Sequence, residues 1–469
     1  MPAEESGHPG NLPGSDDRRA IGGYRWASIG VGIVVAALAI WGSRHQYFRW
    51  DEWAYWTTRQ NLLDSGTVKG IVHFFLQPHG GTLSAGIMLL WVPIDWVFGM
   101  HAYLPYVIPA LVAHLVAGLL LFELLVSRLR PGVALATSGI FLVMGHAASG
   151  ISYGWMVGFN YSLAAGFLAL IAILRLERRN EPLMATLTVL AVVTALSFSA
   201  VGIAVAFIVT LAYALRGRFG WAATHLAAAA GPYVLWRAVY QPPALDFRLD
   251  QMTAYLSFMW DGFTTTAADL LRVPGVAFSV LLLIGALVGA LWSHRRGDPL
   301  AFVYISTVAG ALFFYALVAV RGVELDPRAF SADTDRYLYV AGALLLPSLA
   351  WLADRVVSAR ARAAVPLLIL VVWAGAANLH GQLTWYGEAE ALGQANRRTI
   401  ETAAGLVDRL GSLEKGILVA DESARISVAQ LERLARLGKL PCSEDFTAAE
   451  GFAKGRGLGE IVPEDVSCG

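Results

Sequence analysis

Two adjacent carboxylates stand beside the first apolar segment of this 469-residue chain. Residues 24–41 are followed by YFRWDEWAYW, so Asp51 and Glu52 fall where the chain would leave a bilayer. Carboxylates among aromatic side chains at a membrane face are costly to desolvate, which favours a functional role. A carboxylate can accept a proton from an attacking hydroxyl or coordinate a divalent cation. Because neighbouring helix residues point about 100° apart, we expect one acid to act and the other to orient it.

The aromatic residues around the acids allow two interpretations. They are Trp50, Trp53, Tyr55 and Trp56. Aromatic rings are enriched at membrane–water interfaces, so these four could form an interfacial belt. The same rings would also suit sugar rings or a lipid headgroup, and the sequence leaves both interpretations open. We take Trp53 and Tyr55 as candidate substrate contacts.

A polar turn follows the acids and leads into another apolar segment. It lies within VHFFLQPHGGTLS, which holds His73, Gln77 and His79, the last in a Pro-His-Gly-Gly sequence. A histidine here could bind phosphate when protonated, ligate a metal or donate to a sugar hydroxyl. We take all three as candidate binding residues, against the alternative of an ordinary polar loop.

A charged loop precedes a late apolar segment. Its sequence, RGVELDPRAFSADTDRYLYV, begins at Arg321 and holds Arg336 and Tyr337 at the start of the apolar run. The arginine fork suits bidentate recognition of phosphate. Arg336 and Tyr337 are the better candidates for a lipid-phosphate contact because they abut the membrane. The alternative is a solvated loop with local ion pairs.

The composition shows what must position these residues. The chain is 56% hydrophobic and 15% charged, whereas soluble domains carry about 25% charged residues. Long apolar stretches recur from Trp26 almost to Leu379, which predicts an all-α polytopic membrane protein with about 11 transmembrane helices. The predicted spans are 25–42, 104–126, 132–148, 160–175, 183–197, 200–215, 221–240, 274–293, 299–320, 337–353 and 363–379.

The arginines predict the orientation. Clusters of arginine recur between the spans, and positively charged loops stay in the cytoplasm. A cytoplasmic N-terminus keeps every cluster inside if residues 84–99, interrupted by Pro93 and Asp95, form an interfacial or re-entrant helix on the outer side. The outer side then receives a long first loop, the 241–274 loop and the C-terminal tail.

The chain is expected to have three parts. Residues 1–24 read as a disordered cytoplasmic N-terminus, 25–379 as the transmembrane module and 380–469 as a small extracytoplasmic α/β tail. The strand expected in the tail is GILVA. The two cysteines of the chain, Cys442 and Cys468, both lie there, where a disulfide is one alternative and two free thiols are the other.

Several chemistries lack their sequence signatures. The chain has no P-loop, no GxGxxG followed by an acid, no nucleophile elbow and no HExxH. It also lacks the C-x-x-C spacing of metal or redox sites. The formal net charge of +0 argues for no nucleic-acid partner. ATP-driven and nicotinamide chemistry therefore have no support.

The order of these features resembles the GT-C superfamily of integral membrane glycosyltransferases. The features are the acidic pair in WDEW, the motif Gln77-Pro78-His79-Gly80-Gly81 before an apolar helix, and Arg336-Tyr337 at the outer end of a late span. The likeness is strongest over residues 25–180 and weaker at 321–340. The Ala/Gly/Arg-rich composition is typical of a high-GC bacterium, which places the chain in a bacterial plasma membrane.

The resemblance implies a reaction. A sugar would pass, with inversion, from a polyprenyl-phosphate donor to a glycan or lipid acceptor outside the cytoplasm. Asp51 would be the base that deprotonates the acceptor, Glu52 its alternate or partner, and His79 and Arg336 would hold the donor phosphate. Some branches of the superfamily use a divalent cation such as Mg²⁺ or Mn²⁺ near the first-loop acid and others do not.

The main rival is a transporter or flippase for a lipid or sugar of the envelope. Transporters commonly show internal repeats and charged residues deep within several spans. The chain has no convincing repeat, and most of its ionisable residues lie at the ends of spans. A transferase is therefore the first hypothesis and a transporter the second.

Overall fold

A computed structural model describes residues 15–49, 52–55, 59, 62–63, 65–79, 81–176, 181–241, 247–273, 275–324, 331–332, 334–406, 428–436, 440–443, 445–455 and 466. This part of the chain is helical and contains no strand, only an isolated bridge between His79 and Thr82. The long helices are α1 (Ser15–Ser43), α5 (Ala85–Phe98), α6 (Leu104–Val126), α7 (Pro131–Val143), α9 (Val157–Arg175), α10 (Glu181–Phe198), α11 (Val201–Leu215), α14 (Met252–Leu271), α15 (Val276–Arg295), α16 (Ala301–Glu324), α17 (Asp335–Ala359) and α18 (Ala364–Gly405).

Shorter elements connect them. These are α2 (Glu52–Ala54), α4 (Val68–Leu76), α8 (Ala147–Ser152), η2 (Gly154–Met156), α12 (Phe219–His225), η4 (Leu226–Ala230), α13 (Gly231–Tyr240), η5 (Leu249–Gln251), η6 (Ala361–Ala363), α20 (Val428–Arg436) and α21 (Phe446–Gly455). The elements α12, η4 and α13 follow one another without a gap, so residues 219–240 form one helical rod with a π-helical middle.

The chain is a multi-pass membrane protein. Within its described residues, eight helices are long and apolar enough to cross a bilayer: α1, α6, η2 with α9, α10, α15, α16, α17 and α18 with η6. The helices α5, α7 and α11 are apolar but shorter. Each of the expected spans overlaps a helix, and the expected break at Ser197–Ser199 is confirmed, because α10 ends at Phe198 and α11 begins at Val201.

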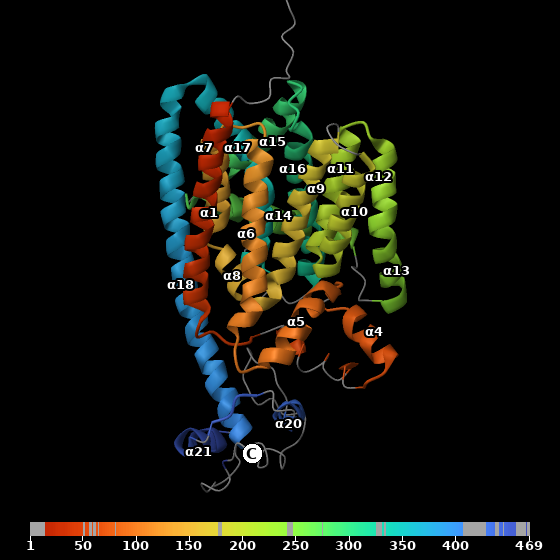
Figure 1. Cartoon of the computed structure of the whole chain (residues 1–469), viewed down its shortest axis with the longest axis vertical. Coiled ribbons are helices and arrows are strands. Elements are labelled where there is room, and N and C mark those ends of the chain that lie inside the picture. The colour runs from red at the N-terminus through yellow and green to blue at the C-terminus, as the bar shows by residue number, and fades with distance from the viewer. Residues whose placement is uncertain are drawn as a thin grey trace, which may run out of the picture.

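The bundle has two chemically different ends (Figure 1). The basic end carries the turns α6–α7, α15–α16 and α17–α18, which hold Arg128, Arg130, Arg295, Arg296, Arg360 and Arg362. The site end carries α4 and α5, and the tail helices α20 and α21 lie beyond it. Helices α1 and α18 both begin at the basic end and end at the site end, so the two run in the same direction through the molecule.

The expectation for residues 84–99 agrees with their placement. They form α5, only 14 residues long, with Pro93 inside it and Asp95 buried. At 1.5 Å per residue this helix is about 21 Å long, which is short of the roughly 30 Å hydrocarbon core. It lies with α4 at the site end (Figure 1).

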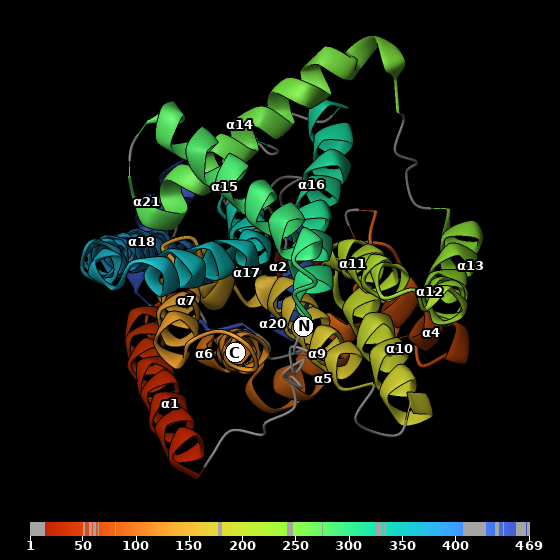
Figure 2. The ribbon, with the colours of Figure 1, turned by 90° about the horizontal axis from the view of Figure 1, so that it is seen from above.

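The expectation of an outer loop over residues 241–274 is wrong, because most of that stretch is the 20-residue helix α14. Seen from above, α14 lies side-on while helices such as α6 and α18 are seen nearly end-on, so α14 runs across the direction of the bundle (Figure 2). Its threonines satisfy their hydroxyls within the helix: Thr264 donates to the carbonyl of Trp260 at 2.9 Å and Thr266 to that of Gly262 at 2.7 Å. A helix can therefore be half-buried here without a long apolar run, which is why the hydropathy pattern missed it.

Two expected boundaries also differ. Helix α1 begins at Ser15, so the last ten residues of the stretch 1–24, expected to be disordered, are helical. Helix α18 runs unbroken for 42 residues through the expected boundary at 379/380. Polar residues beyond Leu379 continue it because Ala, Glu, Gln and Leu are good helix formers.

The tail is described only in part. Helix α20 coincides with a segment expected to be helical, whereas the GILVA strand lies outside the described residues. Cys442 is disulfide-bonded, and the only other cysteine of the chain, Cys468, lies outside the described residues.

The first loop and the tail share one hydrophobic core at the site end. Its centre is a set of edge-to-face aromatic contacts, such as Phe48 with Tyr103 and Tyr106 at centroid distances of 5.0 Å each. Such pairs contribute roughly 0.5–1.5 kcal/mol beyond area burial. Helix α18 packs closely on this core, because a Cβ on Gly393 would lie 2.7 Å from the backbone nitrogen of Tyr47. The core holds the turn that follows α4 in a fixed place.

Candidate active site

The site begins with the turn between α4 and α5. The backbone N–H groups of His79 and Thr82 each donate to the other's carbonyl at 2.9 Å, which closes a tight turn. Gly81 within it has φ +77°, a left-handed conformation that favours glycine. A Cβ on Gly81 would also lie 2.8 Å from Nη1 of Arg321, so the turn and this guanidinium are in close approach.

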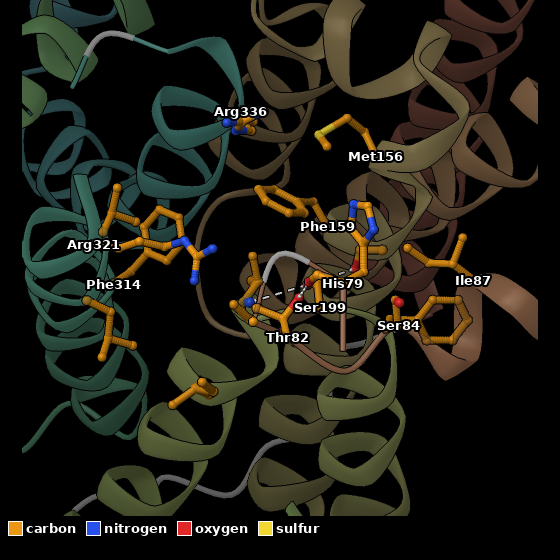
Figure 3. A pocket seen from close by; sticks show the side chains of 18 of the residues that line it. His79, Thr82, Ser84, Ile87, Met156, Phe159, Ser199, Phe314, Arg321 and Arg336 are labelled. Atoms are coloured by element: carbon orange, nitrogen blue, oxygen red, sulfur yellow. Dashed lines mark hydrogen bonds between the residues drawn. The ribbon is translucent and has the colours of Figure 1, made fainter. Parts of the chain in front are cut away.

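A cavity of about 240 Å³ opens on this turn and collects side chains from distant parts of the chain. His79 comes from the turn, Arg237 from α13, Arg321 from the end of α16, and Arg336 and Tyr337 from the first turn of α17. Figure 3 shows His79 and Arg321 on facing sides of the cavity, with Arg336 above them. The His79 turn and the Arg336-Tyr337 pair, two of the three predicted motifs, therefore meet in one place.

One part of the cavity wall carries basic side chains, and the rest of the wall is largely apolar. Three arginines and a histidine line it, and no Asp or Glu is among the described residues that do. The remaining wall is largely apolar: Ile87, Met156, Phe159, Phe198, Val201, Ile203, Phe314, Leu317 and Val318. Such a lining fits a ligand with an anionic group joined to a hydrocarbon, because each part finds a matching surface.

Aromatic contacts hold two of these side chains. The His79 ring packs on Trp155 of η2, with the ring centroids 4.4 Å apart. Arg336 places its guanidinium carbon 5.1 Å from the Tyr337 ring centroid, and its Nη2 donates to the Tyr337 hydroxyl at 3.5 Å. Both contacts restrict side chains that would otherwise be mobile.

Glu52 lies close to this site but does not line the cavity. It is completely buried, and its carboxylate accepts hydrogen bonds from the Tyr103 hydroxyl at 2.7 Å and the Arg49 backbone at 2.9 Å. Burial raises the pKa of Glu52 to about 7, although the nearby Arg49 guanidinium and the hydrogen bonds oppose this rise. The same Tyr103 hydroxyl accepts from the N–H of Gly154, so Glu52 ties the first loop to η2.

Four other candidates from the sequence do not reach the cavity. Trp53 and Tyr55, expected to contact substrate, are 1% and 0% exposed within the aromatic core, so the expectation is corrected: their rings pack against protein. His73 lies in α4 with its ring 5.5 Å from that of Tyr240. Gln77 ends α4, and its backbone N–H donates to the carbonyl of His73 at 2.8 Å. These four residues lie in the elements that precede the turn, and their side chains do not line the cavity.

Sequence reasoning did not single out Arg59, which holds the same turn. Its side chain is buried, and its guanidinium donates to the carbonyls of Phe74 and Gln77 at 2.7 Å each and to the Ser84 hydroxyl at 2.8 Å. One guanidinium therefore joins the end of α4 to the start of α5. An arginine within an aromatic first loop was a signal that could have been used.

Arg237 and Arg321 were also missed as site residues. Both lie at the ends of apolar helices, where arginine is common for reasons of membrane topology. Only the packing of α13 and α16 around the cavity distinguishes them from the arginines of the basic end.

Asp51, the predicted base, lies outside the described residues. Among the residues that are described, no group of three or more His, Cys, Asp or Glu side chains could hold a metal ion. Two acids of the first loop, Asp51 and Asp64, lie outside the described residues, so the residues that are described supply no donor set for a divalent cation.

Changing Gly81 to alanine tests the close approach of turn and guanidinium. We expect Gly81→Ala to lower the melting temperature and to raise the KM for the substrate about tenfold, because the new Cβ both strains the backbone and displaces Arg321. Gly66→Ala is the matched control, since Gly66 has φ +62° with nothing within 4 Å of its Cβ position. Equal effects of the two changes on KM would show that the contact with Arg321 is unimportant.

The comparisons with known proteins concern the fold. No family model and no curated protein matches the chain. Among solved structures, it is similar to ArnT from Cupriavidus metallidurans bound to undecaprenyl phosphate, with 13% identity, a TM-score of 0.46 and coverage of 94% of this chain and 89% of that one. It is also similar to the Archaeoglobus fulgidus oligosaccharyltransferase in the apo form, with 11% identity, a TM-score of 0.45 and coverage of 91% and 68%.

One of these neighbours is bound to undecaprenyl phosphate and the other is an oligosaccharyltransferase. The identities and TM-scores are too low for residue roles to be carried over. Every role in this chain therefore rests on its own geometry.

Proposed function

We propose that the protein is a membrane glycosyltransferase that moves a sugar from a polyprenyl-phosphate donor to a cell-envelope acceptor. The observation that carries this proposal is the cavity in which His79, Arg237, Arg321 and Arg336 meet beside an apolar wall and without a described acid. The donor combines a phosphate with a long hydrocarbon, and both parts match the lining.

The arginines favour cleavage as well as binding. The donor is a phosphodiester with one negative charge. When the bond between the anomeric carbon and the phosphate oxygen breaks, the electron pair leaves with the polyprenyl phosphate, which becomes a monoester with a second negative charge. Cations preorganised around that oxygen stabilise the transition state more than the ground state, which is the condition for catalysis.

The acceptor side needs a base. Asp51 would take the proton as an acceptor hydroxyl attacks the anomeric carbon from the face opposite the phosphate, which inverts the configuration. Glu52 is better suited to orienting than to reacting, because it is fully buried and already accepts from Tyr103 and Arg49. It would fix η2, and with it Trp155 and the His79 ring.

The arginine distribution supports an extracytoplasmic site in a bacterial plasma membrane, with an inner N-terminus and an outer C-terminal tail. The arginine-rich turns lie at the basic end and the cavity lies toward the other end. On the outer side no nucleotide is needed, because the lipid phosphate is itself the leaving group. A divalent cation bound beside Asp51 would be compatible with this scheme, and no step here depends on one.

The test is a transfer assay with the purified chain in proteoliposomes. We expect sugar to pass from a radiolabelled polyprenyl-phosphate sugar to an envelope-lipid extract, with release of polyprenyl phosphate, and no transfer from a nucleotide sugar. Nucleotide-sugar use would overturn the proposal. Movement of intact donor between leaflets without cleavage would favour the alternative of a lipid or sugar flippase, for which the clustered arginines would be a headgroup site.

A further inference from the structure

His146 joins two acids from different helices just outside the arginine cavity. It follows α7 and precedes α8, outside the apolar helices, and its side chain is 12% exposed. Its Nδ1 lies 2.6 Å from Oδ1 of Asp335, and its Nε2 lies 2.9 Å from Oδ2 of Asp269. Asp269 is in the last turn of α14, and Asp335 is the first residue of α17.

Both contacts require the charged form of the ring. A neutral imidazole has one N–H and can donate to only one of the two carboxylates, whereas the imidazolium donates to both. The Arg272 guanidinium, 3.4 Å from the other oxygen of Asp269, supplies a second positive charge. Two acids are therefore balanced by two cations.

This cluster is not a metal site. The ring stands between the two carboxylates and uses opposite nitrogens to reach them, so the three side chains do not converge on one ion. His146 also does not line the arginine cavity. Its position matters through its neighbours: Asp335 is followed directly by Arg336 and Tyr337, which do line it.

We propose that His146 is a positioning residue, whose bridge to Asp269 and Asp335 fixes the first turn of α17 and so aims Arg336 and Tyr337 into the cavity. The segment before that turn makes local hydrogen bonds: the backbone N–H of Tyr337 donates to the carbonyl of Thr334 at 2.8 Å, and the Thr334 hydroxyl donates to the carbonyl of Ser331 at 2.7 Å. The bridge, by contrast, ties the turn to α14 and to the connection between α7 and α8. The proposal rests on the proposed function for its kinetic consequence.

The charged groups around the ring are Asp269, Asp335 and, through Asp269, Arg272. Helix α18 contributes neutral amides: Asn378 accepts from the N–H of Gly145, and Gln382 donates to the carbonyl of Met144 at 3.0 Å. The buried His114 of α6 is turned away and contacts the Tyr339 hydroxyl and the carbonyl of Leu142.

The bridge should open at alkaline pH. Burial by itself lowers the pKa of His146, but the hydrogen bonds that it donates to Asp269 and Asp335 raise it overall, from 6.5 to about 9. Because the folded pKa lies above the unfolded one, the bridge contributes fully below pH 6.5 and is lost as pH rises through about 9. Removing one of the two carboxylates should lower the pKa of His146, so the bridge should be lost at a lower pH.

The experiment compares His146→Ala, Asp335→Asn and the control Asp261→Asn, an exposed acid on the same helix as Asp269. Hydrogen exchange is followed over the start of α17, and the pH profile of transfer is measured with its KM for donor. We expect faster exchange in the first two variants, a KM raised about tenfold, and an alkaline limb displaced to lower pH in Asp335→Asn. The control should match wild type in all three.

Unchanged exchange at the start of α17 in His146→Ala would overturn the proposal. An unchanged alkaline limb in Asp335→Asn would also overturn it. So would a decrease in kcat that the lower melting temperature explains by itself, because both outcomes would indicate a general structural role. A wild-type protein that transfers no sugar would reject the proposed function instead, and the exchange measurement would still decide whether His146 fixes the turn.

Discussion

Asp51→Asn is expected to abolish sugar transfer, with kcat lowered by roughly 1,000-fold or more while the protein stays folded and inserted. Asparagine matches aspartate in size but cannot accept the proton of the acceptor hydroxyl, and a positioned base contributes typically 10²–10⁴-fold. The measurement is transfer in proteoliposomes, with thermal unfolding of the same preparation to show that the fold is intact. Retained activity would remove Asp51 from the mechanism.

The neighbouring acid is the matched comparison. Glu52→Gln keeps one side-chain oxygen and therefore one of the two hydrogen bonds that Tyr103 and Arg49 donate, so we expect a loss in kcat on the order of tenfold only. The two substitutions alter adjacent carboxylates in opposite roles. A larger loss of kcat in Glu52→Gln than in Asp51→Asn would make Glu52 the base and Asp51 the orienting residue.

Arg321→Met is expected to lower kcat by about 100-fold or more and to weaken binding of polyprenyl phosphate. The reason is that the methionine fills a similar volume but leaves the leaving phosphate without one preorganised cation, and losing one such donor costs about 10²–10³ in kcat. Arg336→Met should act in the same direction. The two changes together should cost less than the product of the single effects, because both serve the same phosphate.

Arg248→Met is the control for surface charge. Arg248 is exposed, is paired with Asp250 at 3.0 Å and does not line the cavity. Surface ion pairs of this kind contribute little, so activity should stay within a factor of two or so of wild type. A drop equal to that of Arg321→Met would mean that net charge, and not placement in the cavity, matters.

The helical membrane architecture could be predicted from the sequence because apolar length is a strong signal in a bilayer. Each expected span overlaps a helix, and the short interrupted segment 84–99 forms the short helix α5. Helix α14 could not be predicted in this way. Thr264 and Thr266 are satisfied by carbonyls of the same helix, and most of its buried residues lie in its C-terminal half, so it carries no long apolar run.

The site could be predicted only in outline. The motif at His79 and the pair Arg336-Tyr337 were recognised, and the structure brings them to one cavity. Whether an arginine at the end of a span faces a cavity or the solvent depends on how the helices pack, so Arg237 and Arg321 could not be chosen over the other arginines. For Trp53 and Tyr55, an aromatic side chain that contacts substrate and one that packs in a core look the same in sequence.

Helix α18 constrains how the length of this protein can vary. It contacts the bundle at Asn378 and Gln382 and the first loop at Gly393 and Asn396. Removing one residue between these two sets would rotate everything beyond it by about 100°, whereas removing seven would restore the angle to within about 20° and shift it axially by about 10 Å. Homologous chains that keep both sets of contacts should therefore differ in length here by multiples of seven residues. Such changes keep the contacting side chains on the same face of the helix and alter only the distance between the two sets.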